Sequence, residues 1–250
     1  MRRTTGCFWL VAFSTVLCFG SWAFAQEPVT LAGPNPNYSW YDTNYNEQVS
    51  VGPYVATVNG AANQAVICDD YSDSVTVGQS WKVSVMNFAS LTVSNLGSTM
   101  WGATLGSTQS VLNDYLEAAW LAEKLVAANS VPNNGAIVAA IQYAMWGIFN
   151  SSALSGGPQG SGQQSASYWY TLATSQSGLS ASQFANLEIL TPLNGNSTCH
   201  ANAGCAQEYF LVVAEGGTAA MYLLLATLTC LATVLLRSRC LHNNKEHQVT

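Results

Sequence analysis

Two apolar segments near the ends of the 250-residue chain constrain its folding most strongly. The first, 7–19, follows two arginines and precedes an Ala-Phe-Ala site at 23–25. A basic start, a short apolar run and a small-x-small site are typical of a secretory signal peptide. We therefore expect residues 1–25 to be removed on export, so that the mature chain begins at Gln26.

The second apolar segment, 219–236, predicts a membrane-spanning helix. About 18 residues that rise ~1.5 Å each would cover ~27 Å, close to the thickness of a hydrocarbon core. Arg237, Arg239 and Lys245 follow it, and the positive-inside rule then places the tail 237–250 in the cytoplasm. We expect an exported protein on the cell surface, held in the membrane by this single C-terminal helix.

The segment between them, 26–218, is acidic and poor in charge. It contains two of the seven basic residues, Lys82 and Lys124, and all of the thirteen acidic residues except Glu246. A negative surface repels the phosphates of nucleic acid, so a nucleic-acid partner is excluded. One histidine, His200, and no Cys-x-x-Cys pair give no metal-ligand pattern, so we expect neither a metal nor a cofactor.

Three cysteines remain in this segment, which is an odd number for an exported protein. Cys199 and Cys205 lie close together in a stretch with Gly and Asn, and we expect them to form a disulfide in an oxidising compartment. Cys68 is then left without a partner. It could be a buried thiol, an intermolecular bridge or a reactive group.

The spacing of apolar residues predicts strands, then helices, then strands again. The expected strands are 54–58, 65–67, 74–77, 81–85, 187–190 and 209–213, and the expected helices are 110–128, 134–149 and 165–175. This order predicts an α+β fold. We expect a β-rich subdomain with a helical insertion, followed by a single C-terminal transmembrane helix.

Two short motifs carry the chemistry expected of this chain. Val-Ile-Cys-Asp-Asp at 66–70 ends a predicted strand, and Ile-Gln-Tyr-Ala-Met-Trp at 141–146 lies on the second predicted helix. Together they resemble the signatures of the thioester domain of bacterial surface adhesins. That family has a hydrophobic-Cys-hydrophobic-Asp/Asn motif and a hydrophobic-Gln-x-Ala-hydrophobic-Trp motif. Asp69 stands where the first motif has an apolar residue, and the likeness extends in layout over 38–213.

The resemblance implies that the domain 26–213 holds an internal thioester between Cys68 and Gln142. The expected environment of this bond consists of Asp69, Asp70, Tyr143, Met145 and Trp146. The two acids would accept a hydrogen bond from the Gln142 amide or transfer a proton, and the apolar side chains would exclude water. Such a domain is not an enzyme: it captures an amine or hydroxyl of a surface protein or polysaccharide covalently.

The C-terminal pattern resembles the sorting signals of bacterial surface proteins. Residues 214–218 include Gly216-Gly217 and lead into the apolar segment and its basic tail. They are similar to the exosortase (PEP-CTERM) and Gly-Gly rhombosortase types, without the Pro-Glu-Pro of the first. This resemblance implies a sorting protease as a further partner.

Two other functions remain open from the residues. A lone cysteine at a strand end is often a small buried hydrophobe, so the chain could be a non-enzymatic structural or extracellular-matrix surface protein with Cys68 unreactive. The acids of 69–73 could instead serve a secreted hydrolase. The mass of the purified protein separates the thioester from the structural alternative.

Overall fold

The computed structural model describes residues 26–34, 38–193 and 206–213. Several expectations lie outside these residues and concern the two ends and one loop. They are the signal peptide 1–25, the Cys199–Cys205 disulfide, the motif 214–218, the apolar run 219–236 and the tail 237–250.

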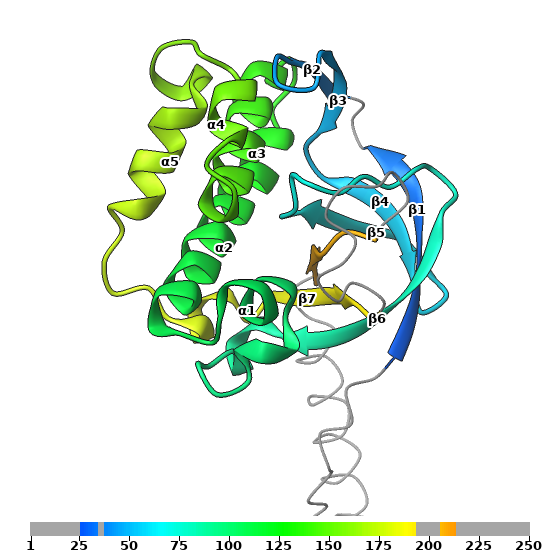
Figure 1. The fold of residues 1–250 in the computed structure, drawn as a ribbon. Coiled ribbons are helices and arrows are strands. Elements are labelled where there is room, and N and C mark those ends of the chain that lie inside the picture. Colours follow the sequence, from blue (N-terminus) through cyan, green and yellow to red (C-terminus); the bar gives the residue numbers. More distant parts are fainter. Residues whose placement is uncertain (1–25, 35–37, 194–205, 214–250) are drawn as a thin grey trace, which may run out of the picture.

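Six strands form a closed antiparallel barrel (Figure 1). Around the barrel they follow the order β1 (Gln26–Pro34), β4 (Tyr54–Val58), β5 (Ala61–Cys68), β8 (Tyr209–Val212), β7 (Leu187–Pro192) and β6 (Ser80–Asn87). β6 pairs with β1 and completes the ring. β1 shifts register against β4 between Leu31 and Gly33, and Gly33 has a positive φ of 139°. Bulges of this kind bend a strand, which helps a sheet to close.

The helices enter the chain between β6 and β7 and cover one side of the barrel (Figure 1). They are α1 (Met100–Leu105), α2 (Gln109–Asn129), α3 (Gly135–Phe149), α4 (Ala153–Gly156) and α5 (Ala166–Thr174), with 3-10 turns η1 (Phe88–Ser90), η2 (Leu96–Ser98), η3 (Gly162–Gln164) and η4 (Ala181–Phe184). A separate hairpin, β2 (Tyr38–Asp42) and β3 (Glu47–Val51), contacts α3.

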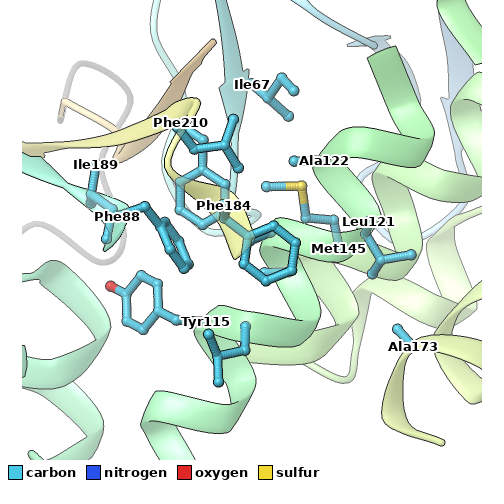
Figure 2. Packing of buried hydrophobic residues seen from close by; sticks show 14 of the residues in the cluster. Ile67, Phe88, Tyr115, Leu121, Ala122, Met145, Ala173, Phe184, Ile189 and Phe210 are labelled. Atoms are coloured by element: carbon cyan, nitrogen blue, oxygen red, sulfur yellow. The ribbon is translucent and has the colours of Figure 1, made fainter. Parts of the chain in front are cut away.

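The core has two apolar clusters because successive strand residues point to opposite faces. In β5, Ile67 belongs to the cluster between barrel and helices, whereas Val66 and Cys68 belong to a second cluster formed largely by the barrel strands. Figure 2 shows part of the first cluster, where strand residues such as Phe210 meet helix residues such as Met145. The alternation therefore turns Cys68 away from the helix-facing side of β5.

The α+β fold class predicted from the sequence, a β-rich subdomain with a helical insertion followed by a transmembrane helix, was wrong. The strands close into a six-stranded barrel with a few helices against it. Closure depends on β1 pairing with both β4 and β6, and on β8 joining β5 to β7. Hydrophobic periodicity reports local strands and carries no information on which distant edges meet.

The membrane anchor is also corrected. Among the described residues, no helix is both long and apolar enough to cross a membrane. α2 is long enough, but it carries charges including Asp114, Glu117 and Lys124, and α3 has only 15 residues. The run 219–236 lies outside the described residues, so an anchored cell-surface location is not carried further.

Candidate functional site around Cys68 and Gln142

The fold brings the two motif residues into contact although 74 positions separate them. β5 ends at Cys68, and α3 passes this end of the strand. The Gln142 side-chain amide, Nε2, donates a 2.7 Å hydrogen bond to the backbone oxygen of Cys68. Both residues are buried, with exposed fractions of 1% for Cys68 and 0% for Gln142. The carboxamide therefore lies against the cysteine main chain in a site closed to bulk water.

The Cys68 thiol is held by the backbone of Asp70. Its Sγ donates to the Asp70 carbonyl oxygen at 3.1 Å and accepts from the Asp70 N–H at 3.4 Å. Burial raises the thiol pKa well above its ordinary value, and the negative charges of Asp70 and Asp69 raise it further. Hydrogen bonds with the Asp70 backbone and the Trp146 indole lower the pKa, but by less than burial raises it. The resting group is therefore a neutral thiol.

The Gln142 carbonyl oxygen is the unsatisfied atom of the pair. Oε1 is buried and accepts no hydrogen bond from the described residues. Leaving a buried acceptor without a donor costs roughly 1–3 kcal/mol, so native proteins keep few such groups. A glutamine that only packs in the core gains no stability from an unsatisfied carbonyl oxygen.

Asp69 and Glu208 form a buried acid pair next to the thiol. Glu208 lies just before β8 and accepts hydrogen bonds from the Met100 N–H and the hydroxyls of Tyr115 and Thr191. The carboxyl group of Asp69 shares a side-chain hydrogen bond with that of Glu208. Burial and then the charge of Glu208 raise the Asp69 pKa well above its ordinary value. A protonated Asp69 beside an ionised Glu208 is the arrangement that these contacts favour.

Asp70 connects the thiol to a cavity of about 340 Å³. Its carboxyl Oδ1 accepts from the N–H groups of Ser72 (2.8 Å) and Asp73 (3.4 Å), and the carboxyl group also shares a side-chain hydrogen bond with that of Asp73. Burial, followed by the nearby Asp73 charge, raises the Asp70 pKa to about 7. This carboxyl can therefore gain or lose a proton near neutral pH.

The apolar side chains expected to surround the bond do not all lie together. Tyr143 and Trp146 pack edge to face at 4.9 Å and share the Cys68 cluster with Tyr71. Met145 belongs instead to the cluster between barrel and helices. On a helix the next residue turns by about 100°, so Met145 and Trp146 face different sides of α3.

Sequence reasoning missed three buried polar residues of the site, Asp42, Gln207 and Glu208. Gln207 donates its side-chain amide to the backbone oxygens of Asp70 and Asp73, and so holds the loop that follows Cys68. A polar pair directly before the apolar run at 209–212 was the only available signal. Such pairs also begin ordinary strands, so the signal does not point to this site.

The described residues contain no group of three or more His, Cys, Asp or Glu side chains arranged to hold a metal ion. What the site offers is a buried thiol, a carboxamide in contact with its backbone, and carboxyl groups able to carry protons. No family model, curated protein or solved structure matches this chain in comparisons with known proteins.

Proposed function

We propose that the chain forms an internal thioester between the Cys68 sulfur and the Gln142 acyl group and uses it to capture an amine or hydroxyl nucleophile covalently. The observation that carries this proposal is the 2.7 Å contact between the Gln142 amide and the Cys68 backbone, with both side chains buried. This contact supports the proposal because the Gln142 carboxamide lies against the backbone of the residue that bears the thiol.

The bond forms by addition and loss of ammonia. The Cys68 sulfur adds to the Gln142 Cδ, the C–N bond breaks, and the thiol proton leaves with the amide nitrogen as ammonia. An amide reacts poorly with a thiol in water, but fixed proximity can lower the barrier by about 7–11 kcal/mol. Burial also keeps water from hydrolysing the product. Asp69 or Asp70, both with raised pKa values, can carry the proton from sulfur to nitrogen.

A second candidate is a structural protein in which Cys68 is unreactive. One observation favours it: the thiol is neutral, buried and hydrogen-bonded to the Asp70 backbone, as expected of a cysteine that only packs. In this alternative Gln142 has a structural role, the hydrogen bond from its amide to the Cys68 backbone.

The intact mass of the purified protein tests the proposal. We expect the chain to weigh less than its sequence by one ammonia, and methylamine to add the mass of one methylamine to this form. Cys68→Ala and Gln142→Ala should each show the full sequence mass and no reaction. Gln64→Ala, which removes a half-buried glutamine of the same strand β5, should keep the ammonia deficit. A wild-type chain at its full sequence mass would leave the structural alternative.

A further inference from the structure

We propose that the proton shared by Asp69 and Glu208 is a pH-sensitive latch for β8, the strand that closes the barrel. While the proton is bound, β8 stays in the sheet. Once the proton is lost, the start of β8 separates from β5 and β7. The inference does not depend on the thioester, but it concerns the strand that covers Cys68, because Cys68 pairs with Tyr209 of β8.

Glu208 joins the start of β8 to four other segments. Its carboxyl group accepts hydrogen bonds from the Met100 N–H at the start of α1 (2.8 Å), from the Tyr115 hydroxyl of α2 and from the Thr191 hydroxyl of β7. Its backbone oxygen accepts from the Asp69 N–H in the segment after β5. Glu208 is fully buried and lies one position before β8. The position of β8 therefore depends on the bonds that this one residue makes.

The remaining bond of the Glu208 carboxyl group requires a proton on Asp69. The two side chains share a hydrogen bond, and both are fully buried. An ionised carboxyl group has no donor, so two carboxyl groups can share a hydrogen bond only if one of them is protonated. Three donors already bond Glu208 and favour its ionised form. The shared proton therefore belongs to Asp69.

The titratable groups that face Asp69 offer no positive charge. They are Cys68 of β5, Asp70 in the loop after it, Tyr115 of α2, Glu208, and Tyr209 of β8. The contacts from α1 and β7 are an N–H and a hydroxyl, which do not titrate near neutral pH. Loss of the shared proton therefore leaves two carboxylates together in a buried site, where desolvation and like charge both oppose ionisation.

Separation of β8 is the local way to relieve this repulsion. β8 has four residues, the fewest of the barrel strands, so it has the fewest ladder bonds to lose. In the closed form, burial and then the Glu208 charge raise the Asp69 pKa well above its ordinary 3.8, to which it returns on opening. The stability that the latch contributes is therefore full below pH 3.8 and is lost as the pH rises through the raised pKa.

The test measures hydrogen exchange of the β8 amides in the purified protein, as protection relative to the intrinsic exchange rate at each pH. Between about pH 5 and about pH 8, wild-type protection should fall by up to about tenfold per pH unit, the limit for one proton released on opening. Asp69→Asn keeps a side-chain donor to Glu208 but has no proton to lose, so its protection should fall less steeply by up to that factor. Asp114→Asn, which removes a half-buried carboxyl group of α2, should follow the wild type.

Equal pH dependence of β8 protection in the wild type and in Asp69→Asn would overturn the inference, because the shared proton would then not control the strand. If Asp69→Asn fails to fold, the wild type decides alone. β8 protection that stays constant over this pH range would overturn the latch. So would β8 amides that exchange no faster than the Leu121 and Leu125 amides of α2 at the upper end of the range, since β8 would then open only with the whole domain.

Discussion

Three carboxyl groups near Cys68 are fully buried, although acidic side chains are rarely buried in proteins. Asp69, Asp70 and Glu208 each have an exposed fraction of 0%, and burial is the largest cause of the raised pKa of each. Hydrogen bonds offset part of this rise: those from Thr191, Tyr115 and the Met100 N–H act on Glu208, and those from the N–H groups of Ser72 and Asp73 act on Asp70. The folded chain therefore binds more protons than the unfolded chain in the weakly acidic range.

This difference predicts how stability changes with pH. The Asp70 pKa is about 7 in the folded chain against an ordinary value of 3.8. Its contribution to stability is therefore full below pH 3.8 and is lost as the pH rises through 7. Each such group changes the free energy of unfolding by at most about 1.4 kcal/mol per pH unit in this window. Denaturant unfolding across the window should show a smaller fall for Asp70→Asn, and parallel curves would contradict the assignment.

At the scale of elements, one carboxyl group joins the small hairpin to the helical layer. Asp42 ends β2 and is buried, and its Oδ2 accepts from the hydroxyls of Tyr71 (2.7 Å) and Tyr143 (2.8 Å). Its Oδ1 accepts from the N–H groups of Asn44 and Tyr45 in the hairpin turn. The hairpin, the loop after β5 and α3 are thus held at one point beside the cavity.

Tyr143→Phe should therefore weaken this junction. The change removes one buried hydrogen bond and leaves the Tyr71 bond in place, so we expect a loss of about 1–2 kcal/mol in the free energy of unfolding. Tyr41→Phe is the matched control, because the Tyr41 hydroxyl bonds Asn46 on the exposed side of the hairpin. Equal effects of the two changes in denaturant unfolding would show that Asp42 does not hold the elements together.

At the scale of the whole molecule, the last described strand completes the barrel. β8 lies between β5 and β7, and its Phe210 and Leu211 belong to the two different core clusters. Without β8 both neighbouring strands would carry an unpaired edge, and both clusters would lose a buried side chain. Closure is therefore a property of nearly the whole span from 26 to 213.

Two truncations test this dependence. A chain that ends at Glu208 lacks β8 and should show no cooperative thermal unfolding and strong binding of a hydrophobic dye, because the edges of β5 and β7 are exposed. A chain that ends at Val213 keeps every barrel strand and should unfold cooperatively. Cooperative unfolding of the shorter chain would mean that the barrel is stable without closure.

The sequence predicted local elements better than their arrangement. The 3.6-residue stripes predicted helices at 110–128 and 134–149, and the structure has α2 at Gln109–Asn129 and α3 at Gly135–Phe149. The expected strand at 74–77 is irregular and lines the cavity instead. β1 was missed, since prolines and a glycine interrupt its alternation. Its strand form depends on partners on both edges, which no local pattern contains.

For the candidate site, the sequence alone determined the two motif residues and their elements: Cys68 at a strand end and Gln142 on a helix. Only the tertiary structure decided that the Gln142 amide meets the Cys68 backbone, that Asp70 lines a cavity, and that Glu208 lies beside Asp69. The physical reason is the distance along the chain over which each effect acts. Periodicity and propensity act over a few residues, whereas burial, charge coupling and barrel closure arise between segments more than 70 positions apart.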